Sequence, residues 1–286
     1  MDATGQTSSR SVASKTFPSI HLQGTREQRS RIMPNKFFWY DIMTTDTKAA
    51  QKFYSDVVGW GAQDSGVPNS NYTLLTVGGR GVAGLMPIPE EARKAGAGPC
   101  WMGYVGVEDV AEAGKQLVRA GGKLHRGPCD VPNVIRFSVV ADPQGAGFII
   151  AKGLVHDAPP ALPDGTPGTV GWHELYAGDR ETAFQFYGKL FGWTKADAVD
   201  MGAMGTYQLF ATGGDPVGGM MTKPPMIPAP YWSYYFNVPA IDAASKRVTD
   251  GGGEIHNGPM QVPGGHWIIQ CQDPQGAVFA LVAPKR

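Results

Sequence analysis

The tetrapeptide Asp-Pro-Gln-Gly occurs twice, at 142–145 and 273–276, and the two copies lie 131 residues apart. Their surroundings repeat as well, with a shift of 133 residues in the early part of each half and 131 in the later part. The matching pairs are Trp39 and Trp172, Phe53-Tyr54 and Phe186-Tyr187, Gly59-Trp60 and Gly192-Trp193, Trp101 and Trp232, Val107 and Val238, His125 and His256, and Pro132 and Pro263. Because the offset drifts by only two residues, we infer one folding unit that is present twice.

The repeat divides the 286 residues into two modules, and each is large enough to bury its own core. We place module 1 at 34–153, a linker rich in proline and glycine at 154–170, and module 2 at 171–286. Residues 1–33 are rich in Ser, Thr, Arg and Gln and have little hydrophobic period. They predict a disordered N-terminal extension.

Charge and cysteine usage exclude several classes of protein. Lys+Arg and Asp+Glu both number 25, and we find no extended basic run, so we expect no nucleic-acid partner. No stretch approaches the roughly 20 apolar residues that span a bilayer, so we expect no membrane partner. The three cysteines stand at unrelated places in the repeat, which fits a reducing cytoplasm better than a disulfide framework. We expect a monomer or a homodimer.

Hydrophobic spacing predicts the same order of elements in both modules. In module 1 the apolar run Phe37–Thr44 predicts a strand, and Asp46 and Gly59 bracket a helical pattern as N-cap and C-terminal glycine. Gly78-Gly79 marks a hairpin between two further strands. A strand from Trp101, a second helix and three more strands follow. Each module is therefore two β-α-β-β-β units, and the fold class is α+β.

The spacing Asp46-x6-Phe53-Tyr54-x4-Gly59-Trp60 recurs from Asp179 to Trp193, and each copy precedes an Asp-Pro-Gln-Gly. With this pattern the chain resembles the vicinal oxygen chelate superfamily of glyoxalases, bleomycin-resistance proteins and dioxygenases. More narrowly, it resembles a bacterial two-module group labelled hydroxylase or glyoxalase-like. The resemblance implies that each pair of units curls into a half-barrel sheet around a cavity, with the helices outside.

The resemblance also implies where a divalent metal would be bound, because enzymes of this superfamily hold it with His and Glu from cavity-facing strand positions. The positions of this chain that match those ligands are Trp39, Gly84, Met102 and Ile149 in module 1 and Trp172, Gly219, Ser233 and Ala280 in module 2. None of these is a usual ligand for such a metal. A shift of one residue would bring in His173, which alone holds no metal tightly. We therefore expect no metal and no other cofactor.

Strand alternation predicts which side chains line the two cavities instead. On the inward face it places Trp39, Met43 and Tyr104 in module 1 and Trp172, Tyr176 and Tyr235 in module 2. We expect these residues to bind the ligand, together with Trp101 and Trp232 from the same strands as Tyr104 and Tyr235. Asp41 and Glu174 share the inward face of the first strands, whereas His173 takes the opposite face and should pack beneath the helices. Rigid aromatic rings with a few polar groups suit small planar ligands.

The roles of Asp41 and Glu174 stay open at the level of sequence. They are candidate catalytic general bases if burial raises their pKa. Alternatively, they are hydrogen-bonded to the backbone or to a tyrosine, or they bind a cationic group without chemistry.

We expect a metal-independent protein that binds a small organic molecule, as bleomycin-resistance proteins do. The alternative is a glyoxalase-like lyase or isomerase, or a dioxygenase-type oxidoreductase, that uses Asp41, Glu174 or a metal site not visible in the sequence. A third reading, an interaction scaffold, predicts filled cavities and large exposed apolar patches.

Overall fold

The structure is a computed structural model that describes residue 1 and residues 34–67, 70–155 and 161–286. The expected N-terminal extension, apart from residue 1, and residues 156–160 of the expected linker lie outside the described residues. None of the helices that the described residues form is long and apolar enough to cross a bilayer.

The described residues of each module follow the predicted order of elements. Module 1 comprises β1 (Phe37–Thr44), α1 (Thr47–Val58), β2 (Gly61–Asp64), β3 (Thr73–Val77), β4 (Arg80–Pro87), α2 (Glu90–Lys94), β5 (Cys100–Gly106), α3 (Val110–Arg119), β6 (Lys123–Val131), β7 (Ile135–Ala141) and β8 (Gly147–Gly153). Module 2 comprises β9 (Val170–Ala177), α4 (Arg180–Phe191), β10 (Thr194–Asp200), the 3-10 turn Gly202–Met204, β11 (Thr206–Ala211), β12 (Pro216–Thr222), β13 (Tyr231–Asn237), α5 (Ile241–Asp250), β14 (Glu254–Gln261), β15 (Trp267–Gln272) and β16 (Val278–Ala283).

Each module forms one eight-stranded sheet with two free edges. The order is β2-β3-β4-β1-β5-β8-β7-β6 in module 1 and β10-β11-β12-β9-β13-β16-β15-β14 in module 2. The first strands of the two units, β1 and β5, pair antiparallel at the centre of the sheet, and β9 and β13 do the same. The predicted α+β fold with two β-α-β-β-β units per module is confirmed.

The predicted helix boundaries have a local physical cause. The Asp46 carboxylate accepts hydrogen bonds from the backbone N–H groups of Lys48 and Ala49 at the start of α1, and Gly59 ends the helix with φ 91°. An N-cap carboxylate satisfies amides that the helix leaves free, and a glycine adopts the left-handed turn without strain. Asp179 and Gly192 do the same for α4.

The hydrophobic pattern did not locate the edge strands β2 and β10, although the β-α-β-β-β plan requires a third strand after each first helix. All four residues of β2 and most residues of β10 are exposed, and polar residues are frequent in both. A strand that buries no face leaves no period-2 signal in the sequence, so the pattern could not reveal these strands. Their pairing to β3 and β11 makes each sheet eight strands wide.

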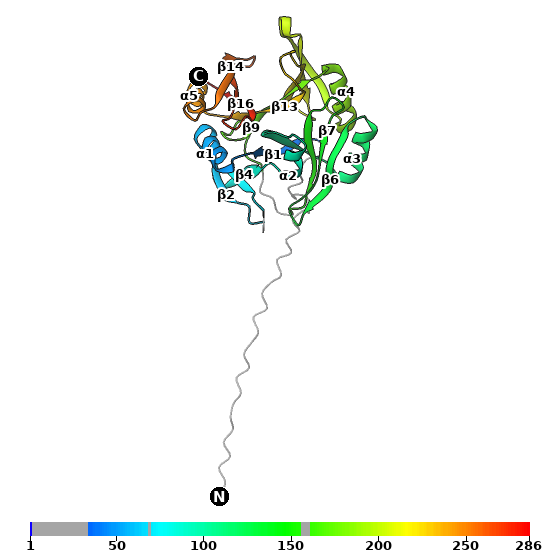
Figure 1. Cartoon of the computed structure of the whole chain (residues 1–286), viewed down its shortest axis with the longest axis vertical. Coiled ribbons are helices and arrows are strands. Elements are labelled where there is room, and N and C mark those ends of the chain that lie inside the picture. Colours follow the sequence, from blue (N-terminus) through cyan, green and yellow to red (C-terminus); the bar gives the residue numbers. More distant parts are fainter. Residues whose placement is uncertain (2–33, 68–69, 156–160) are drawn as a thin grey trace.

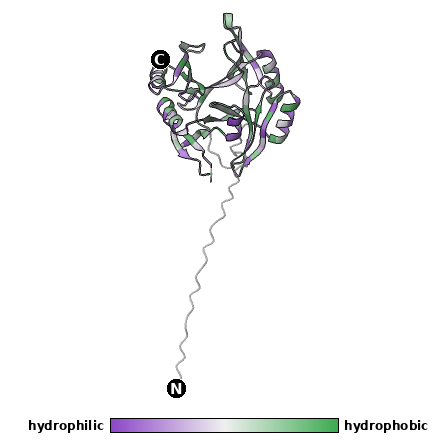
Figure 2. Cartoon of the chain, viewed as in Figure 1, coloured by the Kyte–Doolittle hydropathy of each residue, from purple (hydrophilic) through white to green (hydrophobic). Residues whose placement is uncertain are grey.

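The two modules pack through the faces of their sheets that carry the helices. One continuous core contains side chains of both modules, including Tyr54, Trp101, Tyr187 and Trp232. In Figure 1, α1 of module 1 lies beside α5 of module 2, and α3 lies beside α4, in agreement with the contacts between these helices. Hydrophilic and hydrophobic residues are interspersed along these helices in Figure 2, as amphipathic helices require.

Equivalent residues of the repeat meet across this interface. The Tyr40 hydroxyl lies 2.6 Å from His173 Nε2, and Tyr40 and His173 hold the same position in the two first strands. Trp60 Nε1 donates to the Gly168 carbonyl (2.8 Å), while its counterpart Trp193 donates to that of Asn35 (2.7 Å). The modules are therefore related by an approximate two-fold axis that passes between β1 and β9.

The repeated Asp-Pro-Gln-Gly turns also serve this interface. In module 1, Asp142 Oδ1 accepts backbone hydrogen bonds from Gln144 and Ala146, which closes the turn, and Gly145 has φ 102°. The other oxygen, Oδ2, accepts from the Tyr187 hydroxyl of module 2 at 3.2 Å. Asp273 repeats both contacts, with Tyr54 of module 1 donating at 2.9 Å. Each turn thus joins the end of one module to the first helix of the other.

Candidate functional site

Each sheet has a helix face, which joins the other module, and an opposite face that we call the open face. On the open face of module 1 a second apolar cluster gathers around Met102, Tyr104 and Ile149, with Trp39 and Met43 packed against it. This cluster is separate from the core that the two modules share. The predicted inward positions of β1 therefore lie on the open face.

Asp41 is the centre of the polar contacts on the open face of module 1. Its side chain is buried and accepts hydrogen bonds from Trp39 Nε1 (2.9 Å), the Tyr72 hydroxyl (2.5 Å) and the Tyr104 hydroxyl (2.6 Å). The Trp39 N–H also points at the Tyr72 hydroxyl, 2.8 Å away. These donors satisfy both oxygens of the carboxylate within the protein itself.

Glu174 holds the equivalent place in module 2, with a more polar neighbourhood. Its Oε2 accepts from the Tyr235 hydroxyl (2.6 Å) and from Gln270 Nε2 (3.0 Å). Gln270 Nε2 also lies 2.6 Å from the Tyr176 hydroxyl and 2.7 Å from that of Tyr235. An amide nitrogen carries two hydrogens and here has three acceptors within reach, so the network can exchange partners.

Burial sets the electrostatics of both carboxylates. Desolvation raises the pKa of Asp41, and the hydrogen bonds from Tyr104, Tyr72 and Trp39 oppose that rise. The pKa of Glu174 is raised for the same reason, against hydrogen bonds from the surrounding tyrosines and Gln270. A carboxyl group with a raised pKa exchanges a proton more easily near neutral pH than an exposed one.

The glycines that face these carboxylates make room for tyrosines. Gly84 is the strand neighbour of Asp41, and a Cβ there would overlap the Tyr72 hydroxyl and the Asp41 carboxylate. Gly219 is the neighbour of Glu174, and a Cβ there would overlap the Tyr207 ring. The space of a side chain at each glycine is thus filled by a tyrosine from the adjacent strand or the loop before it.

The placement of Trp101 and Trp232 corrects the sequence-based expectation. Both indoles lie on the helix face, where Trp101 Nε1 donates to the Tyr54 hydroxyl and Trp232 Nε1 to that of Tyr187, each at 2.9 Å. They precede the open-face residues Met102 and Ser233 by one position, and neighbouring strand residues point to opposite faces. These two tryptophans are core residues and cannot contact a ligand on the open face.

Four tyrosine and glutamine side chains were not anticipated. Tyr72 and Tyr207 stand in the same Tyr-x-Leu pattern before the hairpin of each module, and this repeat could have revealed them. Gln270 and Tyr231 correspond to Val139 and Cys100 in module 1, so comparing the two modules gave no signal for them. Tyr231 stacks on Tyr176 with ring centroids 5.1 Å apart.

His173 lies on the helix face, as predicted. Its Nδ1 is 2.8 Å from the Val217 carbonyl, which can only accept, so Nδ1 carries the proton and Nε2 accepts from the Tyr40 hydroxyl. Burial lowers the pKa of His173 to about 4. The histidine is a neutral core residue of the module interface.

Comparison with known proteins agrees with the fold and the repeat. The family model for the glyoxalase/bleomycin resistance protein/dioxygenase superfamily matches twice, over residues 36–150 and 169–281. The chain belongs to this superfamily. "Putative glyoxylase CFP32" of Mycobacterium tuberculosis is 32% identical over 249 residues, which cover 86% of this chain and 94% of that protein. "Anthracycline biosynthesis protein DauV" of a Streptomyces species is 30% identical over 266 residues, covering 88% and 94%.

Solved structures of this superfamily share the fold at low sequence identity. The Mn(II)-bound glyoxalase from Novosphingobium aromaticivorans superposes with a TM-score of 0.62 at 16% identity, covering 88% of this chain and 82% of that one. An extradiol ring-cleaving dioxygenase from B. fuscum gives 0.60 at 14% identity, covering 87% and 71%.

The donor set of this chain does not fit a metal ion such as the Mn(II) of the Novosphingobium glyoxalase. Across the described ranges, no three His, Cys, Asp or Glu side chains come together in a way that could hold an ion. Among the described residues, the buried carboxylates of the open faces are Asp41 and Glu174, and protein donors already engage both. The direct strand neighbours of the two carboxylates are Gly84 and Met102 in module 1 and Gly219 and Ser233 in module 2. On the next strand, Ile149 and Ala280 stand opposite Tyr104 and Tyr235.

Proposed function

We propose that this protein binds small planar organic molecules without a metal, at the open faces of its two sheets. The observation that carries the proposal is the pair of buried carboxylates, each surrounded by protein donors where a metal site would need further ligands. Trp39 and two tyrosines donate to Asp41, and Tyr235 and Gln270 donate to Glu174. Trp39, Tyr72, Trp172 and Tyr207 are only half-buried, so their rings are within reach of a bound molecule. Aromatic surfaces with a few fixed polar groups suit such ligands.

The two open faces favour different parts of this ligand class. Module 1 surrounds Asp41 with Met43, Met102 and Ile149, so it offers mainly apolar contact. In module 2 the surroundings of Glu174 contain Tyr176, Ser233 and Gln270, so this face offers hydroxyl and amide groups. We propose that the open face of module 2 recognises oxygen atoms on an aromatic ligand. The anthracycline biosynthesis name of one group of relatives is consistent with an aromatic ligand.

A second candidate is a glyoxalase-like lyase or isomerase, for which the raised pKa of Glu174 is the specific support. In that case Glu174 would take a proton from a bound carbonyl compound, with Tyr235 and Gln270 holding the oxygen. The name of the mycobacterial relative points the same way. The contact of Glu174 with several donors favours binding over proton transfer, because each hydrogen bond to the carboxylate weakens it as a base.

The binding proposal can be tested by titrating the full chain, treated with a chelator, with small hydroxylated aromatics and with 2-oxoaldehydes while following tryptophan fluorescence. We expect saturable quenching by aromatics that is unchanged when Mn²⁺, Fe²⁺, Ni²⁺ or Zn²⁺ is restored. Tyr176→Phe should weaken binding of hydroxylated aromatics by about tenfold, the usual result of losing one hydrogen bond to a ligand. Binding that appears only after metal is added would refute the proposal.

Turnover separates the two candidates. The chelator-treated chain is incubated with the same 2-oxoaldehydes, and product is followed by NMR. If Glu174 acts as a base, wild type converts a 2-oxoaldehyde and Glu174→Gln abolishes conversion while leaving its affinity nearly unchanged. If the protein only binds, neither form converts it. Asp41→Asn is the matched variant in module 1.

A further inference from the structure

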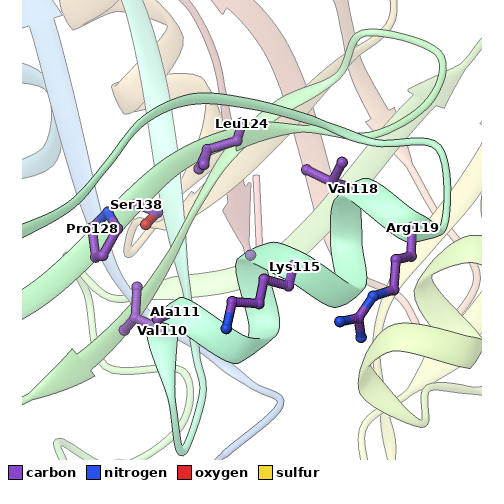
Figure 3. Close-up of a pocket in the computed structure, with 9 residues that line it drawn as sticks. Val110, Ala111, Lys115, Val118, Arg119, Leu124, Pro128 and Ser138 are labelled. Atoms are coloured by element: carbon purple, nitrogen blue, oxygen red, sulfur yellow. The ribbon is translucent and has the colours of Figure 1, made fainter.

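A groove on the helix side of module 1 lies away from both open faces. It lies between α3 and the strands β6 and β7 and has a volume of about 440 Å³ (Figure 3). Its lining is mainly apolar, with two basic side chains, and consists of Val110, Ala111, Gly114, Lys115, Val118, Arg119, Leu124, Pro128 and Ser138. Neither Asp41 nor Trp39 contributes to it.

Small residues create this groove, as the matching place in module 2 makes clear. Gly114 and Ser138 correspond to Ser245 and Ile269, 131 residues further along the chain. Ile269 is fully buried and belongs to the shared core. A Cβ on Gly114 would meet only Ile150, at 4.0 Å. Module 1 thus has an open volume at the place where module 2 has the larger side chains Ser245 and Ile269.

The floor of the groove carries a hydroxyl without a partner. Ser138 is 1% exposed, and its Oγ makes no hydrogen bond within the described part of the chain. In Figure 3 this hydroxyl lies beside Pro128, which has no N–H to offer. A buried hydroxyl that lacks a partner costs free energy, so a ligand that supplies a hydrogen bond there gains stability.

The rim combines positive charge with exposed apolar surface. Lys115 and Arg119 both approach the single carboxylate of Glu112, at 3.7 and 3.4 Å, so two cations share one anion. Val118 and Leu124, at 50% and 40% exposure, present apolar side chains to solvent. An apolar molecule with one negative charge matches this rim.

The helix sets the length of such a molecule. Ala111, near the Ser138 end in Figure 3, is four residues from Lys115 and eight from Arg119. At 1.5 Å per residue these are about 6 and 12 Å along α3. An extended chain of about eight carbons, at roughly 1.3 Å per carbon, has a length between these two distances.

We propose that this groove is a binding site for an apolar carboxylate of about eight carbons that carries a hydroxyl or carbonyl at its far end. The carboxylate lies at Lys115 and Arg119, the apolar body lies along α3 over Val118 and Leu124, and the far oxygen pairs with Ser138.

Nitrogen-15 NMR titrations of the full chain with three probes test this assignment. 8-Hydroxyoctanoate should shift the amides of α3, β6 and β7 saturably. Octanoate, which lacks the far hydroxyl, and octane-1,8-diol, which lacks the charge, should each bind several-fold more weakly, by about three- to tenfold. Ser138→Ile, which copies the residue of module 2, should remove the saturable shifts.

Surface variants keep the test decisive whatever Ser138→Ile does to folding. Lys115→Ala with Arg119→Ala should weaken 8-hydroxyoctanoate and leave the diol unchanged. Lys246→Ala, the counterpart of Lys115 in module 2, should change neither. The proposal is overturned if the three probes bind equally, if shifts centre on the open faces, or if the double variant binds 8-hydroxyoctanoate like wild type.

Discussion

At the scale of single residues, the tyrosines decide what the open faces can do. Tyr72 and Tyr207 fill the space in front of Gly84 and Gly219, so the strand next to each carboxylate can hold only a glycine. The aromatic donors around Asp41 and Glu174 give each buried acid hydrogen-bond partners within the protein. A buried charge or carboxyl group needs hydrogen-bond partners, and here tyrosine, tryptophan and glutamine supply them.

Replacing Gly84 with alanine tests this packing. The new methyl group would overlap Tyr72 and Asp41, and over-packing of this kind usually costs about 1–3 kcal/mol of the free energy of unfolding. Gly98→Ala is the matched control, because no atom lies within 4 Å of its added Cβ. Urea unfolding should show a loss for Gly84→Ala and almost none for Gly98→Ala. Equal effects would mean that the tyrosine does not fill that space.

His173 gives a residue-level prediction about pH. Its folded pKa is about 4, below its ordinary value of 6.5, so between these values the unfolded chain binds more protons. The contribution of His173 to stability is therefore complete above pH 6.5 and is lost as the pH falls toward 4. The total loss is on the order of 3 kcal/mol.

Urea unfolding of wild type and His173→Gln at several pH values between 4 and 7.5 measures this contribution. The difference in unfolding free energy between the two proteins should shrink as the pH falls, because the variant has no group to protonate there. Asp41 and Glu174 are present in both proteins, so their contributions to the unfolding free energy cancel in the difference. Their raised pKa values make stability fall as the pH rises, the opposite of the trend from His173. A difference that is constant with pH would show that His173 titrates normally.

At the scale of elements, the Asp-Pro-Gln-Gly turn of each module is hydrogen-bonded to the first helix of the other module. Trp232 donates to the Tyr187 hydroxyl, which donates to Asp142 of the other module. Trp101, Tyr54 and Asp273 repeat this chain of hydrogen bonds on the other side of the axis. The sequence motif therefore marks the module interface as well as the final strand.

Tyr187→Phe removes the middle member of one of these chains. It leaves the Trp232 N–H and an Asp142 oxygen buried without their partner, at a cost of about 1–3 kcal/mol in unfolding free energy. Tyr54→Phe should lower the unfolding free energy by a similar amount, because it leaves Trp101 and Asp273 without their partner. Equilibrium urea unfolding measures both. A loss close to zero in either variant would mean that water replaces the hydroxyl and that the motif does not depend on it.

The sequence predicted elements well wherever they bury one face. The capped helices α1 and α4 and the central strands followed from hydrophobic period and from Asp and Gly at their ends. The exposed edge strands left no such signal. In the candidate site, alternation placed Asp41 and Glu174 correctly, but Trp101 and Trp232 were assigned to the wrong face. Gln270 was missed because its role depends on side chains that only the folded sheet brings together.

At the scale of the whole molecule, the two modules share one core. The interface contains Phe53 beside Phe279, Trp60 beside Phe236 and Tyr40 against His173, all of them buried. Neither module could keep these side chains from water without the other. The two modules are thus two halves of one cooperative unit, while their open faces lie away from the shared core.

Calorimetry checks this cooperativity. We expect one thermal transition for the full chain, with the calorimetric and van't Hoff enthalpies in agreement, because the shared core must be lost by both modules together. Tyr187→Phe should lower the temperature of that single transition. Two resolved transitions, with the variant affecting only one, would show that the modules are independent domains.

The most direct test of the central claim, ligand binding on the open faces without a metal, is the metal content of the full chain. The protein is produced in medium supplemented with manganese, iron, nickel and zinc, purified without chelator and measured by elemental mass spectrometry. We predict far less than one ion per chain and a melting temperature that a chelator leaves unchanged. One tightly held ion per module, whose removal lowers the melting temperature, would contradict the account.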